Sequence, residues 1–170
     1  MEKSKSLSRY IVTAAIIAAA YVALTYFSAA FGIAYGNIQF RLSEALNILA
    51  AFTPAAIPGL TIGCILGNIA SPIGLIDIVV GAIATFLSAL TIRLISKKLD
   101  RSLPFVAVLP PTLFNSVFVG LEITLFLSEN VSFGYFLLFA AEVALGEMVV
   151  CLALGIPLYR TVKRYLKGVF

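Results

Sequence analysis

Histidine and tryptophan are missing from this sequence, and cysteine occurs only twice, as Cys64 and Cys151. The absence of histidine removes the commonest general base and a common metal ligand. Both cysteines lie in apolar segments without a CxxC spacing, so we interpret them as small packing residues. A phosphate-binding GxxxxGK(S/T) loop is also absent. These absences argue against an enzyme, and neither a metal site nor a cofactor is expected.

Charge is scarce too. Charged residues are 12% of the 170 residues and apolar residues are 61%, with a mean hydropathy of +1.06. Typical soluble domains carry about a quarter charged residues. A globule of this length has too little interior to hide so much apolar surface, whereas lipid accepts it. The sequence predicts one integral membrane domain over residues 1–170, all-α in class.

Most of the sequence consists of long apolar runs. A helix needs about 20 residues to cross a bilayer, and four segments are long enough: 8–30, 75–95, 103–127 and 133–159. Two shorter apolar pieces, 42–52 and 55–69, flank a turn marked by Pro54 and Pro58. They are either two short tilted spans, which gives six helices, or a re-entrant pair, which leaves four full crossings.

The basic residues indicate the orientation. Eleven of the twelve fall in three clusters, namely Lys3, Lys5 and Arg9; Arg93, Lys97, Lys98 and Arg101; and Arg160, Lys163, Arg164 and Lys167. Basic residues concentrate on the cytoplasmic side of membrane proteins. We therefore expect both termini to be cytoplasmic, with the loops near Gly36, Ser71 and Glu129 outside. Arg41 is the exception, and a basic residue on the outer side needs its own reason.

Ionisable and amide side chains inside the apolar segments are the candidate functional residues. Each charged one costs roughly 2.5 to 3.5 kcal/mol on insertion scales, so it is retained for a reason. The set is Arg41, Glu44, Asn68, Asp77, Asn115, Glu122, Glu142 and Glu147. Asn115 and Glu122 are seven residues apart and share one helical face with Phe118. The two asparagines have an equally good alternative role, which is to join neighbouring helices by hydrogen bonds.

The balance of charge among these residues indicates the kind of solute. One cation, Arg41, cannot neutralise the five acids of the set. Some of the acids must therefore be protonated, hydrated or matched by a ligand. Such a pocket suits a cationic or donor-rich solute better than an anionic one. Glu142 and Glu147 are five residues apart, so both need not face the same pocket.

The first apolar segment is rich in alanine, with small residues four positions apart. Such spacing lets another helix approach closely. The candidates for docking a partner are Ala14, Ala15, Ala18, Ala19 and Ala23. Internal packing explains the same pattern equally well.

Four stretches of the chain resemble the QueT family, which contains substrate-binding S-components of energy-coupling factor (ECF) transporters. They read IQFRLSEALNILAAFTPAAIPGLTIGCILGN (38–68), GLIDIVVGAIAT (74–85), LPPTLFNSVFVGLE (109–122) and ALGEMVVCLALGIPL (144–158). The FRxSEAL and FTPAAIPGL strings are the most specific, and the resemblance extends from about residue 9 to 163.

The resemblance implies a six-transmembrane-helix bundle in a prokaryotic cell membrane, with a pocket that opens outward. It also implies partners, which are a transmembrane coupling subunit and two ATPase subunits, with the alanine-rich face of the first helix docking on the coupling subunit. The implied substrates are queuosine precursors: queuine and the 7-aminomethyl or 7-cyano 7-deazaguanines.

The family pattern matches at most of the candidate positions: Arg41, Glu44, Asn68, Asp77, Asn115, Glu122 and Glu147. Glu142 varies in the family. Two alternatives stay open, namely a proton-coupled secondary carrier and an S-component for another vitamin such as a corrinoid. The sequence leaves undecided which precursor is bound, which acid contacts it and whether residues 42–69 span fully.

Overall fold

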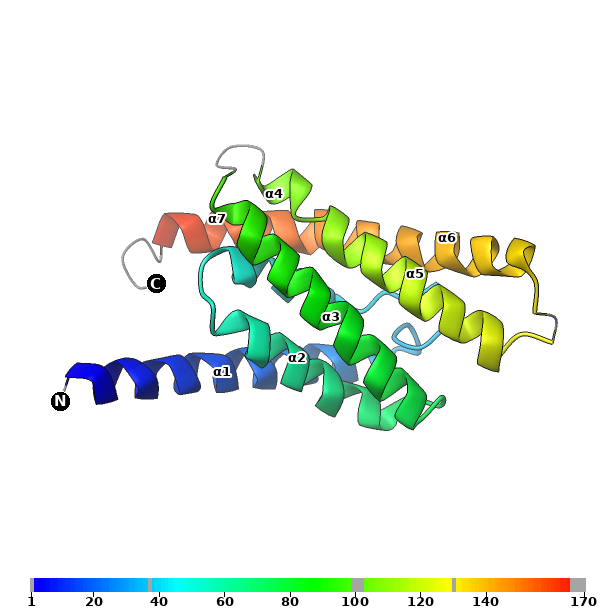
Figure 1. The fold of residues 1–170 in the computed structure, drawn as a ribbon, viewed down its shortest axis with the longest axis horizontal. Helices are drawn as coiled ribbons and strands as arrows, with labels where there is room; N and C mark the ends of the chain where they lie inside the picture. Colours follow the sequence, from blue (N-terminus) through cyan, green and yellow to red (C-terminus); the bar gives the residue numbers. More distant parts are fainter. Residues whose placement is uncertain (1, 37, 99–102, 130, 166–170) are drawn as a thin grey trace.

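The computed structural model describes residues 2–36, 38–98, 103–129 and 131–165. All regular structure in these ranges is helical, as predicted (Figure 1). The elements are α1 (Glu2–Ala30), η1 (Leu42–Ala51), α2 (Ala56–Gly67), η2 (Asn68–Ala70), α3 (Leu75–Ser96), α4 (Leu103–Val106), α5 (Leu109–Phe126), α6 (Phe133–Val150), η3 (Cys151–Gly155) and α7 (Ile156–Tyr165).

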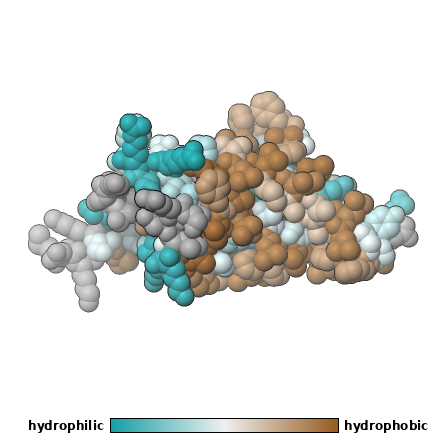
Figure 2. Space-filling view, turned by 90° about the horizontal axis from the view of Figure 1, so that it is seen from above, coloured by the Kyte–Doolittle hydropathy of each residue, from teal (hydrophilic) through white to brown (hydrophobic). Residues whose placement is uncertain are grey.

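Four helical stretches are long and apolar enough to cross a membrane. They are Ser6–Ala30, Leu75–Ser96, Pro104–Phe126 and Phe133–Tyr165, which confirms the four long spans predicted from the sequence. Large apolar side chains on these helices point outward, and Figure 2 shows an apolar surface along the middle of one face. The shorter apolar helices are Leu42–Ala51 and Ala56–Ala70. The chain is therefore a membrane protein whose outer surface suits lipid.

The start of α1, the end of α3 and the end of α7 lie at the same end of the bundle (Figure 1). These helix ends carry the described members of the three basic clusters: Arg9; Arg93, Lys97 and Lys98; and Arg160, Lys163 and Arg164. The side chains of Lys3 and Lys5, and Arg101 and Lys167, lie outside the described residues. The loops after α1, η2 and α5 lie toward the opposite end.

The short segment η1 passes through the interior of the bundle. It is a 3₁₀ helix of ten residues, of which seven are buried, and it packs against α1, α3 and η3. Runs of 3₁₀ helix longer than about four residues are uncommon, and they advance about 2.0 Å per residue. Ten residues thus span about 20 Å, whereas the same number in an α-helix spans about 15 Å. The 3₁₀ conformation lets a short segment reach further.

Residues 31–41, described except for residue 37, fold inward before η1 begins. Ala34 and Gln39 are buried, and the Phe40 amide donates to the Ile33 carbonyl at 2.8 Å. The backbone of Gln39 lies directly against α6 at Gly146, where an added Cβ would meet the Gln39 carbonyl oxygen. Only glycine fits at this contact, so Gly146 sets how deep the segment enters.

Three glycines of α2, spaced four residues apart, let α1 and α2 pack closely. A Cβ added at Gly63 would lie 2.7 Å from the Tyr21 Cβ, and one added at Gly59 would lie 2.7 Å from the Ala14 carbonyl oxygen. Gly67 faces Thr25 in the same way, at 3.1 Å. Small residues at this spacing are what membrane helices use to approach each other.

We predict that Gly63→Ala destabilises the protein, because the new methyl group has no space beside Tyr21. Overpacking of this kind costs typically about 1–3 kcal/mol. Thermal unfolding of the purified protein in detergent measures the effect. Gly134→Ala is the control, because its Cβ would meet nothing closer than the Ser132 hydroxyl at 3.8 Å. Equal melting temperatures for both variants would contradict the close α1–α2 contact.

Candidate functional site

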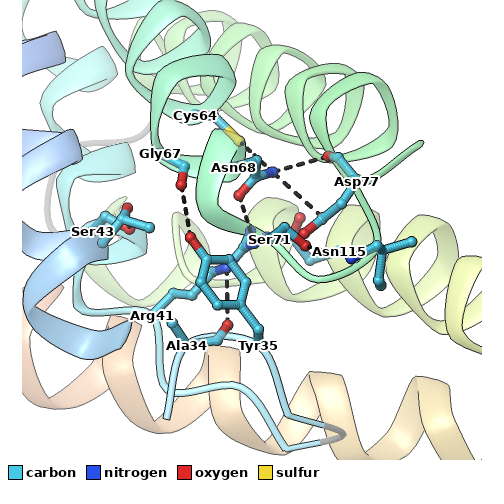
Figure 3. A network of polar contacts seen from close by, with 12 residues as sticks. Ala34, Tyr35, Arg41, Ser43, Cys64, Gly67, Asn68, Ser71, Asp77 and Asn115 are labelled. Atoms are coloured by element: carbon cyan, nitrogen blue, oxygen red, sulfur yellow. Dashed lines mark hydrogen bonds and ion pairs between the residues drawn. The ribbon is translucent and has the colours of Figure 1, made fainter. Parts of the chain in front are cut away.

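Arg41 is buried at the start of η1, and three polar groups surround its guanidinium (Figure 3). Nη2 donates to Asn68 Oδ1 at 2.6 Å and forms an ion pair with Asp77 Oδ2 at 3.3 Å. Nε donates to the Ala34 carbonyl at 3.1 Å. This group of Arg41, Asn68 and Asp77, called the arginine cluster below, joins η1, η2 and α3. These contacts explain why Arg41, a basic residue, lies away from the end of the bundle that carries the three basic clusters.

The partners of Arg41 are themselves held in place. Asn68 Nδ2 donates to the backbone carbonyl of Asp77 at 2.9 Å, and Gly81 leaves the space that this amide occupies. The Arg41 guanidinium lies 5.2 Å from the centre of the Tyr35 ring, a cation–π distance. The Tyr35 hydroxyl donates to the Gly67 carbonyl at 2.7 Å, and burial raises the pKa of this hydroxyl.

Glu44 is the centre of a second group, called the glutamate cluster, which also contains Tyr21, Asn47, Asn115 and Glu147. Glu44 Oε1 accepts from the Tyr21 hydroxyl. Glu44 Oε2 accepts from Asn47 Nδ2 at 2.7 Å and from Asn115 Nδ2 at 3.3 Å. Asn115 Nδ2 also donates to Glu147 Oε1 at 2.9 Å, so one amide links two buried carboxyl groups. Glu44 therefore has three donors, whereas Glu147 has one.

The two clusters meet at the start of η1. Residues three apart lie in line along a 3₁₀ helix, and Glu44 and Asn47 have this spacing within η1, whereas Arg41 is the extended residue that precedes the helix. Arg41 belongs to the arginine cluster and the other two to the glutamate cluster. Arg41 and the first two turns of η1 thus place a cation, a carboxyl group and an amide in the interior of the bundle.

Some buried carboxyl oxygens have no hydrogen-bond partner. Glu122, at 2% exposure, has none on either oxygen, and Glu147, at 3%, has none on Oε2. Half-buried Glu142 likewise has none on Oε2. Within the described residues, no basic side chain forms an ion pair with these three acids. Buried polar atoms normally have partners, so these oxygens retain unused hydrogen-bonding capacity inside the bundle.

The predicted site residues thus separate into three groups. Seven of them are buried, with Arg41, Asn68 and Asp77 in the arginine cluster, Glu44, Asn115 and Glu147 in the glutamate cluster, and Glu122 apart from both. Phe118 is half-buried on the face that Asn115 and Glu122 share. Glu142 is half-buried on α6 and belongs to neither cluster.

The sequence reasoning missed two members of the glutamate cluster. Asn47 follows Glu44 by three residues, a spacing that brings two side chains into line in a 3₁₀ helix. Tyr21 is fully buried in α1, within a run of alanines and other apolar residues. Its hydroxyl gave no signal, because tyrosines in membrane helices commonly serve only to anchor the helix at the lipid interface.

A groove of about 740 Å³ lies on the outer surface of α1 and α2, and its walls are almost entirely apolar. All five alanines predicted to dock a partner line it: Ala14, Ala15, Ala18, Ala19 and Ala23. Ala15, Ala19 and Ala23 are exposed. Ala14 and Ala18 also contact the α2 glycines, so they take part in internal packing as well.

The fold and the site define a helical integral membrane protein with an interior lined by carboxyl and amide groups. The chain belongs to the QueT transporter family, whose family model, described as "QueT transporter", matches residues 11–164. This is a family of transporters and not of enzymes.

A curated relative supports the family assignment. The chain is 46% identical over 85 residues to the "Queuosine precursor transporter QueT" of Lactococcus lactis subsp. cremoris (strain MG1363). The aligned stretch covers 50% of this chain and 48% of the relative, so the chain matches about half of the relative's length. No solved structure matches the chain.

We predict that Asp77→Asn destabilises the protein strongly, because it leaves the buried Arg41 guanidinium without a counter-charge. Breaking a buried ion pair from one side costs about 3–5 kcal/mol. The matched variant Glu122→Gln, at an equally buried carboxyl group without hydrogen bonds, should retain the wild-type stability. Thermal unfolding of both purified variants makes the comparison. Greater destabilisation by Glu122→Gln than by Asp77→Asn would refute the assignment of roles.

Proposed function

We propose that the chain is the substrate-binding subunit of an ECF-type importer in the cell membrane of a prokaryote, with residues 1–170 acting as one binding domain. It captures a queuosine precursor from outside and delivers it to the cytoplasm with a coupling subunit and two ATPase subunits. The observation that carries the binding role is the set of unpaired carboxyl oxygens of Glu122 and Glu147 inside the bundle. The name of the relative supports the substrate.

The proposed topology has six transmembrane helices and both termini in the cytoplasm. Along the chain, η1 and α2 run in opposite directions between the two ends of the bundle, which supports two short crossings (Figure 1). The described basic residues at the ends of α3 and α7 support a cytoplasmic location for that end, by the positive-inside rule. In this topology the unpaired acids are reached from the outer side of the membrane.

The chemistry of a deazaguanine suits these acids. Its guanine-type edge presents a ring N–H and an exocyclic amine, and a carboxylate accepts from both at once. Phe118 is placed to stack on the ring, and such contacts are worth about 1–3 kcal/mol where aromatic side chains meet bases. Tyr35 and Phe139 are the other two aromatic candidates for stacking, but their rings already contact the Arg41 guanidinium and the Tyr135 ring respectively. Stacking is therefore assigned to Phe118.

The apolar groove on α1 and α2 is the proposed docking surface for the coupling subunit. In lipid, helices associate through close packing of small residues, and exposed Ala15, Ala19 and Ala23 provide such a surface. The groove is separate from the carboxyl groups of the interior, so docking and substrate binding can be changed independently.

We predict that Glu147→Gln weakens binding of a deazaguanine by at least about tenfold, since a neutral amide pairs less strongly with the base's donors. Titration calorimetry of the purified protein with queuine, the 7-aminomethyl and 7-cyano deazaguanines, guanine and cobalamin measures it. Glu129→Gln, at an exposed acid, is the control. If the protein prefers cobalamin, or binds no deazaguanine, the proposed substrate is wrong.

We predict that Ala19→Leu abolishes ATP-dependent uptake while substrate binding stays intact, because leucine fills the groove without reaching the interior. Co-purification with the coupling subunit and uptake into liposomes are the two readouts. Ala30→Leu changes an exposed alanine of α1 outside the groove and should leave both unaffected. Uptake driven by a proton gradient without partner subunits would instead identify a secondary carrier.

A further inference from the structure

The last helix, α7, has a basic face that the proposed transport function does not use. Its inner side is buried and includes Tyr159, whereas Arg160 and Arg164 are exposed on its outer side. Lys163 follows Arg160 by three residues and Arg164 follows it by four, so the three side chains are neighbours on the helix surface. Like charges at this spacing repel each other, and an anion bound between them removes the repulsion.

The basic side chains of α7 surround a hollow of about 370 Å³, which is lined by Tyr159, Arg160, Lys163 and Arg164. Tyr159 forms a fixed wall, because it is buried and its ring packs against the Phe52 ring at a centroid distance of 5.0 Å. The Lys163 ammonium lies 5.6 Å from the centre of the Tyr159 ring, which holds this cation at the hollow. Within the described residues, neither arginine forms an ion pair with a carboxylate. The charge of the hollow therefore suits an anion.

The other described basic residues at this end of the bundle are arranged differently. Arg93, at the end of α3, donates to the Ala51 carbonyl at 3.2 Å. Lys97 and Lys98 are exposed after α3 and do not line the hollow. The positive-inside rule explains why basic residues gather on one side of a membrane, but it does not require three of them to share a hollow. The grouping on α7 therefore indicates a ligand.

The position of α7 along its span places the hollow at the level of lipid headgroups. The helical stretch Phe133–Tyr165 is continuous, and about 25 residues of it separate Tyr135 from Arg160, which corresponds to about 38 Å. The hydrocarbon core of a bilayer is about 30 Å thick, and the headgroup layers extend it to about 40–45 Å. Exposed tyrosines such as Tyr135 favour the membrane–water interface. With Tyr135 at one interface, Arg160 lies in the headgroup layer of the other.

We propose that the hollow on α7 binds the phosphate of an anionic phospholipid headgroup. Guanidinium groups present paired N–H donors that match two oxygens of a phosphate, and basic pockets at the ends of membrane helices suit such headgroups. Leu152 and Leu154, which are exposed on the same helical stretch, offer apolar contacts to the acyl chains. A soluble phosphate has no such chains, so these neighbours favour a lipid. The proposal does not depend on which solute the bundle binds.

The test measures lipid binding to the purified protein in detergent, by native mass spectrometry and by thermal unfolding with added phosphatidylglycerol or phosphatidylcholine. The wild type should bind phosphatidylglycerol more tightly than phosphatidylcholine and should be stabilised by it. The double variant Arg160→Gln/Arg164→Gln should bind phosphatidylglycerol at least about tenfold more weakly, since each basic residue beside an anionic headgroup contributes to the affinity. Lys97→Gln/Lys98→Gln is the matched control, because it removes the same charge at the same end of the bundle and should change the affinity less than about threefold.

Four outcomes would overturn the proposal. Equal weakening by both double variants would show a diffuse attraction and no defined site, and an unchanged preference in Arg160→Gln/Arg164→Gln would show that the hollow binds no lipid. Displacement of the lipid by millimolar inorganic phosphate would identify a soluble anion as the ligand. Loss of co-purification with the coupling subunit, with lipid binding unchanged, would assign the hollow to an acidic protein surface. Unfolding without added lipid verifies that each variant is folded.

Discussion

A guanidinium in the interior of a membrane protein stays charged, so the chain must keep a carboxylate beside it. Arg41 meets this requirement with Asp77, and Asn68 bonds to both residues. The contact ties η1 to η2 and α3, and it fixes the point from which η1 enters the bundle. The column of polar residues on η1 follows from that starting point. The arrangement of the candidate site therefore depends on one ion pair.

The bundle keeps polar side chains in its interior, while many of its large apolar side chains are exposed on the surface that faces lipid. Residues 31–41, described except for residue 37, fold into the bundle between α1 and η1, and Gly146 makes space for them. Their entry places Arg41 in the interior, directly before η1. The long 3₁₀ helix η1 then carries the chain toward the basic end (Figure 1). The inward fold of this segment thus explains both why η1 and α2 are short and why polar groups lie in the interior.

Much of this arrangement could be predicted from residue types alone. Runs of apolar residues located the four long helices, and the cost of burying charge in lipid located the acids of α3, α5 and α6. The sequence could not predict that Asn47 aligns with Glu44, because LSEALNILAA also suits an α-helix, in which the alignment is different. Nor could the sequence show which of the buried acids are paired with another side chain. Only the contacts distinguish Asp77, which is paired with a cation, from Glu122, which has no partner.

The central claim is that a solute binds at the unpaired carboxyl groups inside the bundle, and not in the apolar groove on α1 and α2. An experimental structure of the purified protein with a bound deazaguanine tests it most directly. The account predicts the base beside Phe118, in contact with Glu122, Glu147 or both. A base located in the groove, or one within the bundle that touches neither acid, would contradict it.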